Sequence, residues 1–186
     1  MRCGTWLNPA AASNVRLEVL ACLPDNNRVQ ADEAQTRELL QTHDDPGHME
    51  FPAHFDHERA ATRFSQLESG LRTAFGACYS SAGQDSSFHG DIEVPAAVTS
   101  GGLMLRVRIS NFGDLAAASS EEALYCDDAE LAELLHPADA ARVYGALDYL
   151  GYIALRLDPL EEMYNGASAF LRERGAPWWD RYFDYL

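Results

Sequence analysis

The chain has 186 residues, is 47% hydrophobic and carries a formal net charge of −15. All 14 basic residues are arginine, which excludes chemistry that needs a lysine amine: Walker A phosphate binding, a pyridoxal phosphate Schiff base, the kinase ATP lysine and a Ser-Lys dyad. The negative charge argues against direct binding to nucleic acid or to an anionic membrane surface, because charges of one sign repel. No apolar run is long enough to span a bilayer.

Length and cysteine spacing predict one domain in a reducing compartment. A chain of this size buries about 70% of its unfolded surface in a single core. The four cysteines form no CxxC pair, unlike a disulfide scaffold or a zinc knuckle. The alanine-rich, lysine-free composition indicates a high-GC, bacterial origin. We expect one cytoplasmic domain over residues 1–186, with 1–13 as an N-terminal arm.

The first half of the chain predicts a strand and two helices. Apolar and polar residues alternate from Val15 to Leu23, as in a half-buried strand. Residues 31–42 predict a short helix, and residues 43–55 an irregular segment broken by prolines. Asp56 is the predicted N-cap of a long helix that ends at Gly76. Its apolar residues recur at helical spacing and predict that it covers the sheet.

The clearest pattern in the chain predicts a hairpin. Residues 88–94 and 103–110 both alternate, and the turn-prone residues 95–102 separate them. Alternate residues of two paired strands share one face, and on the polar face Asp91 and Glu93 lie beside Arg106 and Arg108. These groups predict cross-strand ion pairs. The alternative is an acid/base site in which His89 and Asp91 act on an anionic substrate that the arginines hold.

The second half predicts more helix. Asp127 to Glu130 form a capping-box pattern, Pro137 opens a further helix, and residues 152–157 alternate as a last strand. The whole pattern predicts the α+β class: a mainly antiparallel sheet of about four to six strands, with helices packed chiefly on one face.

Four histidines, at His43, His48, His54 and His57, alternate with carboxylates, and these are ligand types for zinc, iron or manganese. Their spacing matches no established motif, and Ala61 stands where HExxH needs its second histidine. A solvated polar loop is therefore the preferred interpretation. A small metal-dependent hydrolase is the alternative, and no cofactor is predicted.

A long acidic stretch and an aromatic end are the candidate partner-binding features. Eight acids and no base lie between Arg108 and Arg142, and such a field attracts a basic protein. Its predicted contact residues are Glu121, Glu122, Asp128 and Glu133. Trp178, Trp179 and Tyr182 predict either core packing or an exposed anchor. Trp178 is four residues from Tyr182, and Trp179 is four residues from Phe183, so a short helix here has two aromatic faces. A solvated acidic face and a buried aromatic plug are the structural alternatives.

These observations favour a binding protein over an enzyme, because no nucleophile motif or catalytic signature is present. The preferred hypothesis is a small acidic bacterial protein of the inhibitor or immunity type, which neutralises a basic protein partner such as a toxin or nuclease-like effector. A metal-dependent hydrolase and a structural subunit of an assembly are the alternatives.

Overall fold

The computed structural model describes residues 30–83, 86–120 and 128–184. In these ranges a five-stranded sheet has the order β1-β2-β3-β4-β5. The strands are β1 (Tyr79–Ala82), β2 (Phe88–Val94), β3 (Leu105–Ser110), β4 (Leu115–Ser120) and β5 (Ile153–Ala154). The helices are α2 (Glu33–Thr42), α3 (His57–Phe75), α4 (Asp128–Leu134), α5 (Pro137–Tyr149), α6 (Asp158–Glu161), α7 (Ala169–Arg174) and α8 (Trp178–Phe183), with a 3-10 turn at Ala96–Val98. The predicted α+β class is confirmed; the predicted arm at 1–13 and strand at 15–23 lie outside the described residues.

The sheet is antiparallel from β1 to β4, while β5 runs parallel to β4. The hairpin of β2 and β3 has the predicted register, with Asp91 opposite Arg108 and Glu93 opposite Arg106. A type I′-like turn joins β3 to β4, because Gly113 and Asp114 both have positive φ, at 63° and 54°. The sheet is thus built mainly from local hairpins.

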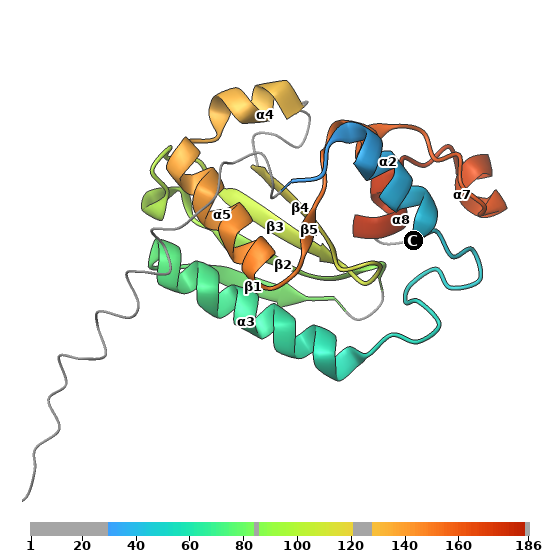
Figure 1. The fold of residues 1–186 in the computed structure, drawn as a ribbon, viewed down its shortest axis with the longest axis horizontal. Coiled ribbons are helices and arrows are strands. Elements are labelled where there is room, and N and C mark those ends of the chain that lie inside the picture. The colour runs from blue at the N-terminus through green and yellow to red at the C-terminus, as the bar shows by residue number, and fades with distance from the viewer. Residues whose placement is uncertain (1–29, 84–85, 121–127, 185–186) are drawn as a thin grey trace, which may run out of the picture.

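The two longest helices, α3 and α5, cover one face of the sheet (Figure 1). The carboxylate of Asp56 accepts a hydrogen bond from the Arg59 amide and caps α3, which ends at the left-handed Gly76, as predicted. Phe64, Leu67 and Leu71 of α3 pack with Val143 and Leu147 of α5 over the apolar face of β2, β3 and β4. This is the helix-on-sheet layer that the sequence predicts.

A second core lies against the other face and beyond β4. It joins Leu40 of α2, Leu160 of α6 and Leu171 of α7 to Tyr182 and Phe183 of α8. Figure 1 places α2, α7 and α8 together on the side of the sheet that β5 occupies. This second layer, made of short helices, is not predicted by the sequence patterns. Among the described helices, none is both long and apolar enough to cross a membrane.

Candidate functional site: the surface around helix α2

The charged side chains on the polar face of the β2–β3 hairpin form ion pairs with one another. Arg108 binds both carboxylate oxygens of Asp91, with Nη2 3.0 Å from Oδ2, and donates to the Phe183 carbonyl. Arg106 pairs with Glu93. The predicted cross-strand pairing is confirmed. The Asp91 carboxylate is already bound by Arg108. The pKa of His89 is lowered, chiefly by burial and secondly by the charge of His57. The hairpin therefore presents no open acid/base site.

The four histidines of the predicted metal site are not brought together. His48 bonds to Asp45, with 2.9 Å between Nδ1 and Oδ2, whereas the ring of His57 packs edge-on against Phe51 and Phe55. His43 lies against Gly113, and His54 lines a shallow pocket with Arg59. Within the described ranges, no group of three or more His, Cys, Asp or Glu side chains has a geometry that could hold a metal ion.

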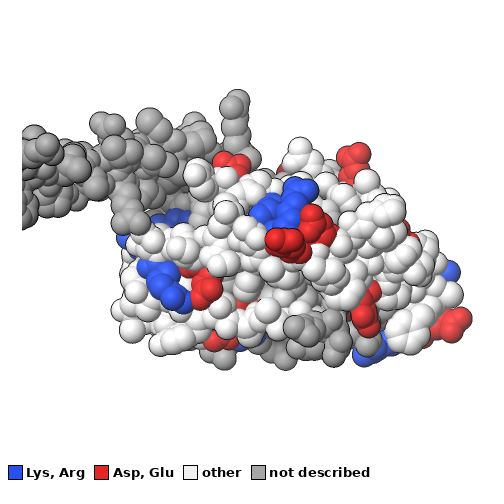
Figure 2. Space-filling view, turned by 90° about the horizontal axis from the view of Figure 1, so that it is seen from below, with Lys and Arg blue, Asp and Glu red and all other residues white. Residues whose placement is uncertain are grey.

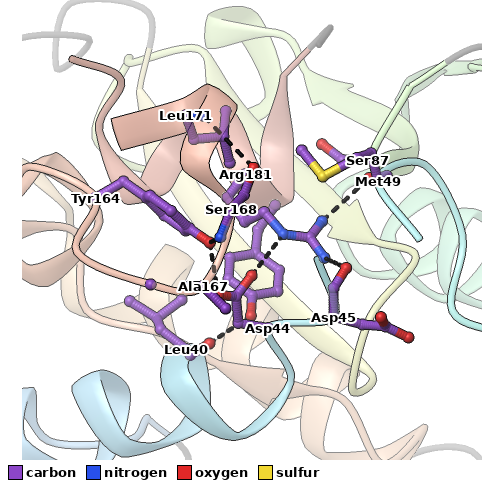
Figure 3. A network of polar contacts seen from close by, with 12 residues as sticks. Leu40, Asp44, Asp45, Met49, Ser87, Tyr164, Ala167, Ser168, Leu171 and Arg181 are labelled. Carbon is purple, nitrogen blue, oxygen red and sulfur yellow. Dashed lines mark hydrogen bonds and ion pairs between the residues drawn. The ribbon is translucent and has the colours of Figure 1, made fainter. Parts of the chain in front are cut away.

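A buried arginine organises the loop that carries these histidines (Figure 3). The side chain of Arg181, on α8, is 0% exposed, and its Nε lies 3.0 Å from Oδ1 of Asp44. Its remaining N–H groups donate to the carbonyls of Asp45, His48 and Met49. Asp44 also accepts from the Tyr164 hydroxyl and the Ala167 amide. Every charge in this network has a partner, so we assign it to holding the loop rather than to binding.

The aromatic end is largely buried, so core packing and not an exposed anchor holds for two of its three candidate residues. Trp178 is 3% exposed and Tyr182 0% exposed, because α8 lies between the sheet and the segment around α6 and α7 and both of its faces are covered. Trp178 contacts the ring of Tyr164, and the Tyr182 hydroxyl donates to the Leu40 carbonyl. Only Trp179 of the predicted trio is half-buried, beside Arg108.

The acidic stretch also needs correction at Asp128. Its carboxylate is buried and accepts from the amides of Leu157, at 3.0 Å, and Asp158, at 3.1 Å, while Asp158 accepts from the Asp128 amide at 2.8 Å. Each aspartate thus caps the first turn of the other's helix. Burial raises the pKa of Asp128, although the two amides lower it. Asp128 is therefore structural. Glu133 is exposed on α4 as predicted, and Glu121 and Glu122 lie outside the described residues.

Two grooves beside α2 are lined by more acids than bases. One groove of about 580 Å³ lies between the start of α2 and the starts of α4 and α6, and its charged residues are Asp32, Glu33, Asp128, Asp158 and a single base, Arg156. A second groove of about 550 Å³ follows the other side of α2 along β5 and the end of α5, and its charged residues are Glu38 and Asp148. We call these two grooves together the α2 surface.

Sequence reasoning missed most of this surface. Gln30 pairs with Ala154 in a parallel bridge, and the Ala31 amide donates to the Ala154 carbonyl at 2.9 Å. This pairing carries α2 across to residues more than a hundred positions later in the chain. The sequence shows Glu33 and Glu38 on a predicted helix, but no periodic signal places that helix beside Asp148 or Asp158.

Charge is distributed differently on the face that includes α3. In Figure 2 the visible arginines lie next to carboxylates, and no large patch of one sign covers the face. The pairs on α3 explain this, because Arg63 binds Asp114 and Arg72 binds Glu68. The α2 surface is therefore a local feature and not a uniform consequence of composition.

Comparisons with known proteins add no functional information. No model of a known protein family matches the chain, and no match was found among curated proteins or solved structures.

Proposed function

We propose that the protein is a non-enzymatic binding module that engages a basic protein partner through the α2 surface. A bacterial cytoplasmic inhibitor or immunity-type protein is the most specific form of this proposal. The observation that carries it is the charge of the two grooves, whose lining has one guanidinium and six carboxylates, five of them besides the buried Asp128. The chain carries a net charge of −15, so its summed field attracts a partner of opposite sign.

Shape and accessibility also support a protein partner. The two grooves flank a helix of 10 residues whose acids stand at the solvent face. Glu38 and Asp148 are exposed and make no ion pair among the described residues, so both are available to a partner. Glu133 extends the same charge along α4. Exposed, unpaired charges accelerate the encounter of two proteins more than they strengthen the final complex.

The competing enzyme classes lack an assembled centre in the described part of the chain. The hairpin arginines bind the hairpin carboxylates, and the histidines of the 43–57 segment point to separate neighbours. A hydrolase would need several of these groups around one reacting atom.

The test starts with capture of the partner from the native host, followed by measurement of binding with the purified components. A triple variant, Glu38→Gln, Asp148→Asn and Glu133→Gln, removes three charges from the α2 surface and α4. A matched control, Glu50→Gln, Glu58→Gln and Glu173→Gln, removes three exposed charges elsewhere. We expect the first triple to lower the association rate at least about threefold at low salt, and the control to change it much less. Equal effects of the two triples would contradict the proposal.

A further inference from the structure

The two edges of the sheet differ in how they are covered. At the β5 edge, the Ala31 amide and the Gln30 side chain bond to the Ala154 and Leu155 carbonyls, at 2.9 and 3.1 Å. At the other edge, β1 pairs only with β2, and all four of its residues are exposed. No described segment covers the outer side of β1.

The register identifies which backbone groups of β1 face outward. Gly83 donates its amide to the His89 carbonyl at 3.0 Å, so Gly83 and His89 form a hydrogen-bonded pair. Because such pairs alternate in an antiparallel ladder, Ser81 and Tyr79 also bond towards β2. The N–H and C=O groups of Ser80 and Ala82 therefore point away from the sheet.

Apart from its short length of four residues, this edge has none of the usual protection against strand addition. Natural edges are protected by lysine, proline, inward charges or bulges. The sequence of β1 is Tyr-Ser-Ser-Ala, and its pairing with β2 is continuous, since the irregularity in register lies between β2 and β3. An uncharged edge that no described segment covers is the kind of structure that binds an extended segment by main-chain hydrogen bonds.

We infer that the outer edge of β1 binds an extended, basic segment of a partner protein as a sixth strand. Two copies of this chain fit poorly, because each carries a net charge of −15 and like charges repel. A basic segment is attracted instead. Tyr79 is 67% exposed and shares its face with Glu93, whose side chain is 38% exposed. A cation at the adjacent position meets the aromatic face of Tyr79 and shares the Glu93 carboxylate with Arg106.

The inference rests on the proposed function only for the sign of the partner's charge. The β1 edge and the α2 surface lie at opposite ends of the strand order (Figure 1). At about 4.8 Å per strand, five strands separate the two edges by roughly 20 Å. An extended segment of about six residues spans that distance, so one partner can reach both.

The test uses the full chain and a synthetic peptide probe of about eight residues in which lysine alternates with valine and threonine. We expect the peptide, at about nine times its Kd, to slow amide hydrogen exchange of Ser80 and Ala82 about tenfold. The amides of Tyr79 and Ser81, already bonded to β2, should change little. The same peptide with glutamate in place of lysine should not bind.

Ser80→Pro removes one outward N–H without breaking a bond to β2, and proline is tolerated at such edge positions. It should abolish peptide binding, whereas Ser80→Ala, which keeps the N–H, should bind like wild type. The amide spectrum of each variant reports whether the fold is retained. Unchanged exchange at Ser80 and Ala82 with peptide at millimolar concentration, or equal binding by Ser80→Pro, would overturn the inference.

Two further outcomes would also contradict it. Equal binding of the glutamate peptide would remove the charge preference, and protection that grows with protein concentration alone would identify a second copy as the occupant. Because the peptide assay involves no residue of the α2 surface, its failure leaves the proposed function standing, and failure of the α2 triple leaves this result standing.

Discussion

The network around Arg181 and the α2 surface use charge in opposite ways. Arg181 is fully buried, and its charge is matched by Asp44 and by three backbone carbonyls. In the grooves around α2, the carboxylates outnumber the bases, and all of them except the buried Asp128 reach solvent. A buried pair requires both partners because an unpaired charge in the interior is strongly unfavourable. Unpaired charges therefore lie at the surface. We attribute partner binding to these surface charges and the stability of the fold to the buried, paired ones.

The largest expected effect follows from removing the buried cation. Arg181→Leu leaves Asp44 without its ion pair and frees three carbonyls, so the free energy of unfolding should fall by about 3–5 kcal/mol. Urea denaturation measures this. The control is Arg37→Ala, which breaks exposed pairs with Glu33 and Glu162 and should lower the free energy of unfolding far less. Similar losses for both variants would remove the distinction between the two regions.

An intermediate effect is expected at Asp128, which lines the α2 surface but is buried. Burial raises its pKa above the ordinary 3.8, so the folded protein binds this proton more tightly than the unfolded chain does. The contribution of Asp128 to stability is therefore present below pH 3.8 and is lost as the pH rises through the folded-state pKa.

Asp128→Asn should accordingly be less stable than wild type by about 1–2 kcal/mol at acidic pH, because the amide nitrogen cannot accept from the Asp158 N–H. The difference should narrow as the pH rises towards neutrality. Urea denaturation of both proteins across a range of pH measures this stability difference. A difference that widens as the pH rises would contradict the raised pKa of Asp128.

The smallest effect on stability is expected from the exposed acids. The triple variant Glu38→Gln, Asp148→Asn and Glu133→Gln should unfold within about 0.5 kcal/mol of wild type per substitution, because none of these side chains is buried or ion-paired in the described residues. A large loss of stability would assign these acids a structural role and would weaken the comparison.

The parts of the fold that depend on local patterns could be predicted from the sequence. Asp56 and Gly76 bound α3 through their capping chemistry, and the alternation in β2 and β3 sets their register. The network around Arg181 could not be predicted, because Asp44 lies 137 positions away and a lone arginine in an aromatic helix has no pattern that identifies its partner.

The candidate site shows the same division. Glu133 was predicted as an exposed acid from its place in an acidic stretch, but the same argument failed for Asp128, whose partners are amides about thirty positions later. For Trp178 and Tyr182 the core-packing alternative holds, because α8 is covered on two faces, and the i,i+4 spacing alone could not decide between the alternatives. The sequence pattern identifies the helices and strands, whereas contacts between residues distant in the sequence decide which charged side chains remain exposed.

The central claim is that the α2 surface steers a basic partner, and the most direct measurement is the association rate with the captured partner as a function of salt. We expect the rate for the wild type to fall at least about tenfold between about 10 mM and 0.5 M salt, because salt screens charges beyond a few ångströms. The triple variant of the α2 surface should show a clearly shallower dependence than the Glu50, Glu58 and Glu173 control. A rate that ignores salt, or equal slopes for the two triples, would contradict the claim.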